Sequence, residues 1–393
     1  MTMKVDFWSS IEYAAYMREL AAVLEPHGIR LRPRFQVPQT AYWSTHRGTA
    51  GRLLLRLRMY AVYPLQVAFD FLFRREPVVA IVCTTTFYAP WIAVRCAGRR
   101  RKVVNLLYDL YPESIIASGM LRPDSAGARL LRRMATDTLR RAAASVQLGD
   151  RLAAYTLAAF PGTDPARLHT IPFGSVEAPF ATCDPQPRPA GRVPVILYCG
   201  NLGHVHDTET VIAYLSGVLR APSGSAPVVA WRFHATGAGY GQLTAALRPF
   251  IEIAPAAGPG RSSVALAGNL PDGAWEVAMQ DADVALVTMR PGAERVLMPS
   301  KTYSALAAGQ AILAVCPRDS DLADLVIRHD CGWVVEPGNS AGLAAAVQEL
   351  ADRPAELLRR RRNARQAGTA HYGLSVVARQ WAYLLHHLDR PTV

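Results

Sequence analysis

Short apolar runs separated by segments of helical spacing recur along this chain, and this alternation constrains its fold more than any other feature. Val78–Cys83, Val195–Cys199 and Ala311–Val315 are apolar at nearly every position. Such strands are typical of a parallel sheet that is covered on both faces. Parallel strands need long crossover connections, usually helices, so the alternation predicts the α/β class.

The alternation falls into two blocks that are separated by a proline-rich segment. Residues 176–192 lack hydrophobic periodicity, which indicates a linker. We therefore expect an N-terminal domain over residues 1–175 and a C-terminal domain over residues 193–373. Each is expected to be a doubly wound, Rossmann-like sheet, and the two are expected to face each other across a cleft.

Three helices are expected at positions that the structure can test closely. Helical spacing covers Ile11–Leu24, and a basic, apolar helix covers Arg52–Arg75 with a break or kink at Pro64. A third helix, Leu243–Arg248, is expected to stop before Pro249.

Net charge is distributed unevenly along the 393 residues. The chain carries a formal charge of +12, and residues 1–175 hold 24 Lys and Arg against 12 Asp and Glu, so the remainder is balanced. Such asymmetry indicates that the first half faces an anionic partner, or presents a solvated basic surface. Basic residues mixed with leucines at Arg52–Arg58, and the run Arg99–Lys102, are the candidates for contact with anionic lipid. Whether Leu53, Leu54 and Leu57 are exposed or belong to the core stays open.

The remaining composition argues for a globular chain in a reducing compartment. Half of the residues are hydrophobic and 19% are charged, which excludes a disordered chain, a collagen and a coiled coil. The six cysteines form no CxxC pair, so neither a disulfide framework nor a zinc site is expected. The first residues show no signal-peptide pattern, and we expect a cytoplasmic protein, either free or peripheral on the inner face of the plasma membrane.

Two glycine turns that follow buried strands are candidate phosphate sites. Tyr198–Gly203 runs from a strand into a turn with two glycines, and Phe233–Gly239 does the same with Gly237 and Gly239. Glycines let backbone amides approach a phosphate, and the next helix adds positive charge. The alternative for the first turn is an ordinary strand-to-helix connection.

A lysine in the first turn of a helix is the third candidate. In Met298–Gly309, Pro299 and Ser300 are expected to form a turn and an N-cap, and Lys301 follows. A cation there opposes the helix dipole unless an anion docks beside it. The alternative is a solvated surface lysine.

Two carboxylates follow a strand of the first block. Asp109 and Glu113 lie in Tyr108–Ser114, beyond the carboxyl end of the strand Val103–Tyr108. Ligands bind beyond strand ends in such sheets, so the pair is a candidate for orienting hydroxyls or handling a proton. The alternative is a helix cap and a surface glutamate.

Together these residues resemble family 4 glycosyltransferases of the GT-B fold, in particular those that build bacterial capsule, O-antigen and exopolysaccharide units. The resemblance rests on the Gly200–Gly203 turn, Gly237–Gly239, Pro299–Gly309, Asp109–Glu113 and Gly332–Gly338. The resemblance implies transfer of a sugar from a nucleotide diphosphate sugar, UDP favoured and GDP as the alternative, to a glycan or lipid-linked acceptor. It implies retention at the anomeric carbon, no metal and no cofactor beyond the donor itself. The final helix, residues 374–393, would pack back on the first domain.

The same resemblance assigns the site residues. Lys301, Asp109 and Glu113 are expected to be catalytic. The residues expected to bind the donor are Gly200, Asn201, Leu202, Gly203, Gly237, Gly239, Asn269, Leu270, Arg290, Glu294, Met298, Pro299, Ser300 and Ser304.

The chain departs from the family at several of these positions. Ser304 stands where many relatives place a glutamate that bonds the ribose, and Val296 stands at the position of its paired glutamate, with Glu294 nearby. His204 and His206 occupy the region where relatives carry Arg and Lys. The contact to the nucleotide is therefore expected to differ.

Other functions remain as alternatives. A nucleotide-sugar epimerase of the same architecture would need further acid and base groups, and a degenerate, non-catalytic glycosyltransferase would act as an assembly partner. Nucleic-acid binding is not expected, because no helix-turn-helix, aromatic platform or zinc finger accompanies the charge. The sequence Asp281-Ala-Asp283 matches a DxD metal motif, but we expect these two residues to cap a helix and to be solvated. Arg359–Arg362 are expected to form a solvated helix face.

Overall fold

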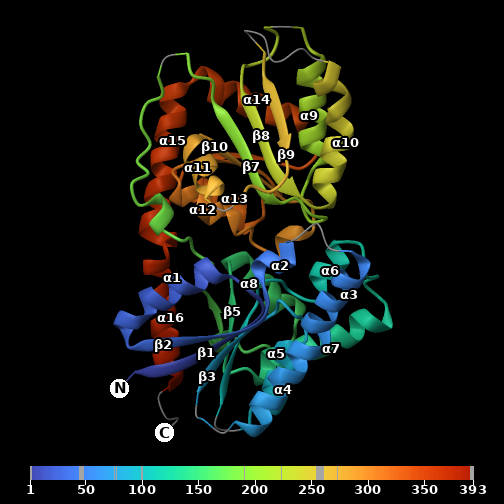
Figure 1. Cartoon of the computed structure of the whole chain (residues 1–393), viewed down its shortest axis with the longest axis vertical. Coiled ribbons are helices and arrows are strands. Elements are labelled where there is room, and N and C mark those ends of the chain that lie inside the picture. Colours follow the sequence, from blue (N-terminus) through green and yellow to red (C-terminus); the bar gives the residue numbers. More distant parts are fainter. Residues whose placement is uncertain are drawn as a thin grey trace. The chain divides into compact units, whose positions relative to one another are not determined.

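The chain forms two compact units, which are described separately (Figure 1). The computed structural model describes residues 2–389 apart from 44–47, 75, 77, 99–100, 190, 223, 254–260 and 272. Unit 1 comprises Met1–Phe173, Arg295–Leu297 and Leu374–Val393, and unit 2 comprises Gly174–Glu294 and Met298–Gly373. The expected linker, residues 176–192, thus falls within unit 2, and residues 295–297 fall within unit 1.

Unit 1 contains a six-stranded parallel sheet in the described part of the chain, with the order β2-β1-β3-β4-β5-β6. Its strands are β1 (Met3–Glu12), β2 (Ile29–Pro38), β3 (Val79–Cys83), β4 (Lys102–Leu106), β5 (Ala144–Gln147) and β6 (Leu168–Thr170). β1 extends through Ile11, where a helix was expected. That expectation was wrong because the segment pairs with β2 up to Glu12.

Helices cover the sheet of unit 1. They are α1 (Ala14–Leu24), α2 (Gln39–Trp43), α3 (Thr49–Leu57), α4 (Tyr63–Phe73), α5 (Ala89–Cys96), α6 (Glu113–Ala117), α7 (Ala126–Arg141), α8 (Asp150–Ala159) and α16 (Leu374–Asp389), with short turns η1 (Glu25–His27) and η3 (Pro165–Arg167). α16 packs against α1 and contacts β3. α4 and α5 bury Tyr63, Val67 and Ala93 against Ala80 and Val82 of β3.

The basic helix of unit 1 is not broken at its proline. α3 continues into the π-helical turn η2 (Arg58–Val62), which continues into α4. Pro64 lies in the first turn of α4, and a proline fits there when no helical hydrogen bond is required of it. The break or kink expected at Pro64 thus corresponds to a π turn that ends two residues before it.

A buried ion-pair network contradicts part of the expected lipid-contact surface. Arg101 is 6% exposed and binds Asp70 at 2.8 Å and Asp6 at 3.1 Å, and its guanidinium lies over the ring of Phe71. A guanidinium held by two carboxylates is not available to lipid. Arg99 and Arg100 of that run lie outside the described residues, and Lys102 donates a hydrogen bond to Leu388 O.

Unit 2 contains a second six-stranded parallel sheet among the described residues, with the order β12-β11-β10-β7-β8-β9. Its strands are β7 (Val195–Asn201), β8 (Ala230–Thr236), β9 (Ser263–Ala267), β10 (Val284–Thr288), β11 (Ala311–Val315) and β12 (Gly332–Val335). Two sheets of this kind confirm the expected α/β class.

The helices of unit 2 are α9 (Glu209–Arg220), α10 (Ala238–Ile253), α11 (Ala274–Asp281), α12 (Lys301–Ala307), α13 (Asp321–Arg328), α14 (Ser340–Asp352) and α15 (Pro354–Ala367), with the turns η4 (Ala178–Phe180), η5 (Ala293–Arg295) and η6 (Gly368–Tyr372). α9, α10 and α14 share a core with the sheet around Trp231, while α12 and α15 contact each other and β11. α10 runs through Pro249, where its end was expected. Leu243 and Leu247 pack the helix into that core, which offsets the hydrogen bond that a proline cannot donate.

Asp283 is buried rather than solvated, which corrects the expectation for the DxD letters. It is 0% exposed, accepts a hydrogen bond from the amide of Val195 at 2.9 Å and pairs with Arg188 and Arg361. Arg361, also expected in solvent, is 8% exposed. The carboxylate thus ties the linker segment, the start of β7 and α15 together.

Candidate functional site

The turn after β7 is open where a ligand could approach it. Gly200 has φ +115°, a conformation that favours glycine, and no atom lies within 4 Å of the position where a Cβ would stand. Within the described part of the chain, the amides of Gly203 and His204 have no hydrogen-bond acceptor. Free amides beside an open glycine are what an anion requires.

The second glycine turn supports the first by packing against it. The amide of Leu202 donates to Thr236 O at 2.7 Å, and the amide of Gly239 donates to Leu202 O at 2.8 Å. A Cβ on Gly237 would lie 2.4 Å from Asn201 Oδ1. Gly237 and Gly239 therefore allow the two turns to approach each other closely. The amide of Gly239 donates to Leu202 O and is not available to a ligand.

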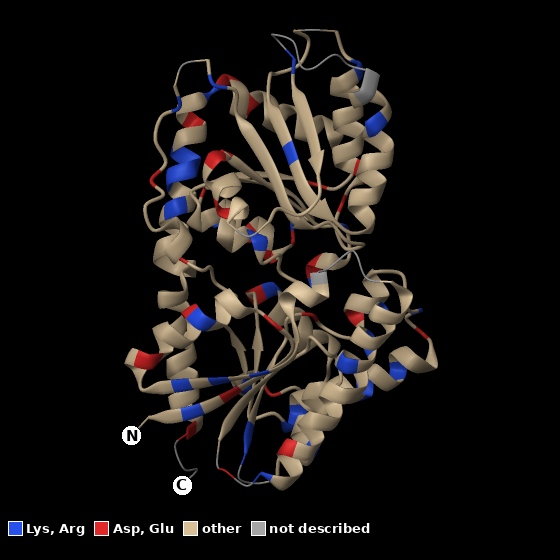
Figure 2. Cartoon of the chain, in the orientation of Figure 1, with Lys and Arg blue, Asp and Glu red and all other residues tan. Residues whose placement is uncertain are grey.

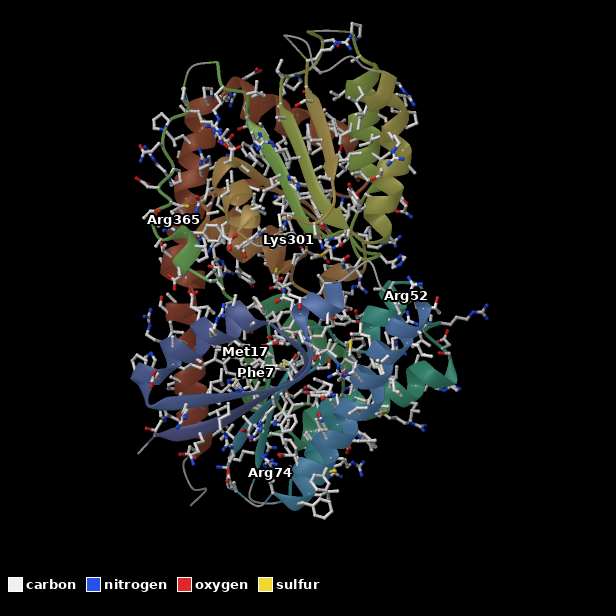
Figure 3. The ribbon with its side chains drawn as sticks, in the orientation of Figure 1. Phe7, Met17, Arg52, Arg74, Lys301 and Arg365 are labelled. Carbon is white, nitrogen blue, oxygen red and sulfur yellow. The ribbon has the colours of Figure 1, made fainter. Side chains whose placement is uncertain are left out.

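Lys301 reaches this turn from the first position of α12 (Figure 3). Its Nζ donates hydrogen bonds to Tyr198 Oη and, at 3.3 Å, to Asn201 O, and it lies 3.8 Å from the centroid of the Tyr198 ring. Burial lowers the pKa of the Lys301 ammonium to about 7, and the Cys199 thiol acts in the opposite direction. Lys301 thus packs against Tyr198 and Asn201 and is not the solvated surface lysine of the alternative.

Tyr198 and His206 belong to the same cluster, although sequence reasoning gave them no role. Tyr198 Oη donates to Asn201 O at 2.7 Å, and the rings of Tyr198 and His206 meet edge to face with centroids 6.0 Å apart. His206 Nδ1 donates to Thr288 O at 2.7 Å. Burial, followed by the charge of Lys301, lowers the pKa of His206 to about 3, so its imidazole is neutral at pH 7. The available signal was the position of Tyr198 at the start of the turn motif and of His206 three residues after its end.

A loop between β10 and α12 forms a second side of the turn. Arg290 binds it through its amide to Val205 O at 3.0 Å and through Nη1 to His204 O at 3.1 Å. Glu294 is buried and accepts from the amide of Gly292 at 2.6 Å, so it shapes the loop. The structure thus joins Arg290 to His204 and Val205, the two residues that directly follow the Gly200–Gly203 turn.

The other donor-site candidates occupy varied surroundings. Met298 and Pro299 are buried, Ser304 is half-buried, and Ser300 is exposed at the N-cap position without the capping hydrogen bond that was expected. Asn269 and Leu270 follow β9, at the carboxyl edge where the Gly200–Gly203 turn also lies. No hydrogen bond among the described residues joins those two to the turn.

In unit 1, Asp109 is held at the end of β4 by its backbone. Thr84 Oγ1 donates to Asp109 O at 3.1 Å and accepts from the Asp109 amide at 3.2 Å. Tyr111 Oη lies 3.5 Å from the carboxylate. Burial raises the pKa of Asp109 to about 6, and the bond from Tyr111 opposes that rise. Such a carboxyl can carry or release a proton near neutral pH.

Glu113 has a different environment. It is 8% exposed and accepts from Arg132 Nε at 3.0 Å, which ties α6 to α7. Its other oxygen is buried with no partner among the described residues. Val296 belongs to unit 1 and accepts from the amide of Leu110 at 3.1 Å, so the segment that replaces the family glutamate braces the loop of Asp109.

Acidic and metal-binding side chains do not cluster in the part of the chain that the structure describes. No group of three or more His, Cys, Asp or Glu there could hold a metal ion. Asp281 pairs with Arg192 and Arg232, which leaves neither carboxylate of the DxD letters open to a cation.

Comparison with known proteins finds similarity to glycosyltransferases. Residues 193–353 match the family described as "Glycosyl transferases group 1". The probable glycosyltransferase WbjE of Pseudomonas aeruginosa is 25% identical over 257 residues, which cover 64% of this chain and 60% of WbjE. The chain thus spans about 60% of the length of that curated relative.

Solved structures show the same fold along nearly the whole chain. Anabaena HepE in complex with UDP has a TM-score of 0.62 at 14% identity, covering 98% of this chain and 100% of HepE. WaaG, a glycosyltransferase involved in lipopolysaccharide biosynthesis, has a TM-score of 0.61 at 13% identity, covering 97% of this chain and 99% of WaaG.

Residues 193–353 are thus similar to group 1 glycosyltransferases, and the chain has the GT-B fold of HepE and WaaG. The resemblance to GT-B glycosyltransferases is thereby confirmed. Membership of family 4 stays a prediction.

Proposed function

We propose that this protein transfers a sugar from a nucleoside diphosphate sugar, UDP favoured over GDP, to a glycan or lipid-linked acceptor in the assembly of a bacterial surface polysaccharide. The observation that carries the proposal is the approach of Lys301 Nζ to Asn201 O within a glycine turn whose Gly203 and His204 amides are free. The UDP complex of HepE and the role of WaaG in lipopolysaccharide biosynthesis support the donor and the setting.

The leaving diphosphate is the group that this site would stabilise. Negative charge grows on it as the bond to the sugar breaks, and preorganised donors lower that barrier most. The amides of Gly203 and His204 and the ammonium of Lys301 are such donors. Tyr198 and Asn201 O hold the lysine in place until a diphosphate takes over its hydrogen bonds.

The reaction is proposed to retain the anomeric configuration and to need neither a metal nor a cofactor besides the donor. Asp109 is the residue we assign to the acceptor side, because it is half-buried and its proton is exchangeable near neutral pH. Turnover in excess EDTA supports this proposal, and loss of turnover that Mg²⁺ or Mn²⁺ restores contradicts it.

Binding of UDP and of GDP, measured by calorimetry, tests the donor site. Lys301→Ala should reduce turnover by about 10²-fold or more, by analogy with removal of one transition-state donor. Arg353→Gln is the control, since Arg353 is an exposed cation of the same unit between α14 and α15. An unchanged rate in folded Lys301→Ala would remove that residue from the site.

Two outcomes would favour the alternatives. Epimerised sugar from donor alone, without acceptor, would make the protein an epimerase. No detectable binding of UDP or GDP at millimolar ligand would make it a non-catalytic assembly partner.

The acceptor is proposed to be lipid-linked and to be met at the inner face of the plasma membrane. In the part of the chain that the structure describes, no helix has the length and hydropathy to cross a bilayer. The excess of basic residues in residues 1–175 supports a peripheral contact with anionic lipid.

A further inference from the structure

One face of the rod formed by α3, η2 and α4 turns large apolar side chains toward solvent. Leu53, Leu57, Leu65, Phe69 and Phe73 are between 53% and 69% exposed. They follow one another at intervals of four or eight residues. We call these five residues the apolar stripe.

The opposite side of the rod is the buried one. Met59, Tyr63, Val67 and Phe71 are at most 3% exposed and lie two positions out of step with the stripe. The rod is thus attached to unit 1 along one side, and its stripe is not part of the core. This settles the question that the sequence left open, because Leu53 and Leu57 face outward.

The π turn helps to keep the stripe on one side. In an α-helix a step of four residues overshoots a full turn by about 40°, so a stripe with this spacing would wind around the rod. A π turn has more residues per turn than an α-helix, so it reduces the total rotation of the stripe around the rod. η2 lies between Leu57 and Leu65, in the middle of the stripe.

Basic residues lie along the rod that carries the stripe (Figure 2). Arg52, Arg56, Arg58 and Arg74 are exposed. Arg52 and Arg74 mark the two ends of the rod (Figure 3). The single acidic residue of the described positions in 49–74 is Asp70, which is buried and binds Arg101 at 2.8 Å and Arg74 at 2.9 Å. Arg52, Arg56 and Arg58 have no acidic partner among the described residues, so the outward face around α3 combines apolar groups with cations that lack a counter-charge.

A groove widens this surface toward the edge strand of the sheet. It has a volume of about 780 Å³ and is lined by Phe35 of β2 and by Leu65, Phe69, Leu72 and Phe73 of α4. Phe35 is itself 41% exposed. The apolar surface thus extends from the stripe onto β2.

We infer that the apolar stripe and its flanking arginines dock unit 1 on the surface of an anionic lipid bilayer. The leucines and phenylalanines would enter the boundary of the acyl chains, and the arginines would meet the lipid phosphates. The charge favours this occupant over an apolar protein partner, because Arg52, Arg56 and Arg58 lack an acidic partner among the described residues and need anions when the apolar patch beside them is covered. The inference rests on the proposed function, since an enzyme that extends a lipid-linked acceptor works where that lipid lies.

Co-sedimentation of the full chain with vesicles tests the inference. Vesicles of phosphatidylcholine alone are compared with vesicles that also hold about 30% phosphatidylglycerol, at low and at high salt. The protein should bind the anionic vesicles and should be released by salt. Leu57→Asp/Phe69→Asp should weaken binding by about tenfold or more, since each change removes an inserted side chain and adds a negative charge.

Met120→Asp/Leu130→Asp is the matched control. Met120 and Leu130 are 71% and 58% exposed, belong to the same unit and lie outside the stripe. This control should bind as the unchanged protein does. Arg52→Gln/Arg56→Gln should weaken binding to anionic vesicles and reduce its dependence on salt.

Three outcomes overturn the inference. The first is that the unchanged protein does not bind anionic vesicles. The second is an equal loss of binding in the stripe variant and in the control. The third is a dimer in solution that dissociates in the stripe variant, because a second copy would then cover the stripe. Binding of UDP is measured on each variant. An unchanged protein that binds UDP but not anionic vesicles contradicts the docking surface alone, whereas absent UDP binding in the unchanged protein contradicts the proposed function.

Discussion

The side chain of Lys301 has a pKa of about 7, so its amine changes between the charged and the neutral form near neutral pH. It donates to Tyr198 Oη and to Asn201 O, and neither partner carries a negative charge to offset its burial. A bound diphosphate would supply that negative charge and would stabilise the ammonium form of Lys301.

Affinity for UDP should depend on pH through this residue. The pKa of Lys301 is about 7 in the free protein, and a bound diphosphate raises it, so binding takes up a proton above pH 7. Affinity should fall by up to about tenfold per pH unit above that pH, because the proton must then be taken up on binding. Calorimetry between pH 6 and 9 in buffers of different ionisation enthalpy measures both effects. Lys301→Ala should flatten the profile, and an unchanged profile in that variant would contradict the assignment.

The two carboxylates of unit 1 should respond to neutralisation in opposite directions. Burial raises the pKa of Asp109 from 3.8 to about 6, so the native state loses stability as the pH rises from about 4 to about 6 and keeps that loss at higher pH. Asp109→Asn should raise Tm at pH 8, with a gain that shrinks as the pH falls toward 4. Glu113→Gln should lower Tm, because it breaks the pair with Arg132.

Activity separates the roles of these two residues. Asp109→Asn should lower turnover by about tenfold or more while the Kd for UDP stays unchanged, because the residue is assigned to the acceptor side. Full turnover in Asp109→Asn would leave that carboxyl without a catalytic role. Kinetics and calorimetry on the same protein samples give both quantities.

At the scale of elements, the glycine turns of unit 2 work as a pair. The turn after β7 holds the open amides, and the turn after β8 braces it through Leu202 and Gly239. The first turn therefore depends on a second one that lies more than thirty residues later in the sequence.

Gly237→Ala tests that dependence. A Cβ there would lie 2.4 Å from Asn201 Oδ1 and 2.8 Å from Leu202 O, at φ +102°. We expect a loss of stability of about 1–3 kcal/mol and weaker UDP binding, because the Leu202 backbone must move. Gly217→Ala is the control, since Gly217 lies inside α9 with nothing within 4 Å and should gain about 0.5–1 kcal/mol. Equal stabilities of the two variants would show that the turns do not require the close approach.

At the scale of the whole chain, unit 1 is discontinuous in sequence. It takes residues 295–297 from the middle and α16 from the end. α16 buries Leu374, Val377, Trp381 and Leu385 and packs against α1. The core of unit 1 is thus complete only when the last residues of the chain have joined it.

Trp381→Ala should destabilise unit 1 by about 3–5 kcal/mol, as expected for a large side chain that is 3% exposed. Tyr383→Ala on the same helix is the control, since Tyr383 is 79% exposed and its loss should change stability by less than about 0.5 kcal/mol. Chemical denaturation measures both. UDP binding should survive in Trp381→Ala at low temperature, because the donor-site candidates belong to unit 2. Similar stabilities of the two variants would place α16 outside the core.

The sequence by itself determined the strands, the glycine turns and the positions of Lys301 and Asp109. These features follow from local chemistry: continuous apolar runs must be buried, glycine permits φ above zero, and a strand end in a parallel sheet faces a ligand. The α/β class was predictable for the same reason. The end of α10 was not, because packing against α9 outweighed the proline signal at Pro249.

Only the tertiary structure decided which partners the charged and apolar groups would have. Asp283 and Arg361 became a buried pair, Arg101 became a core residue, and the leucines of α3 stayed in solvent. Tyr198 and His206 gained their place beside Lys301 in the same way. Burial and ion pairing join residues that are distant along the chain, and no local spacing specifies which of many arginines will meet a given carboxylate.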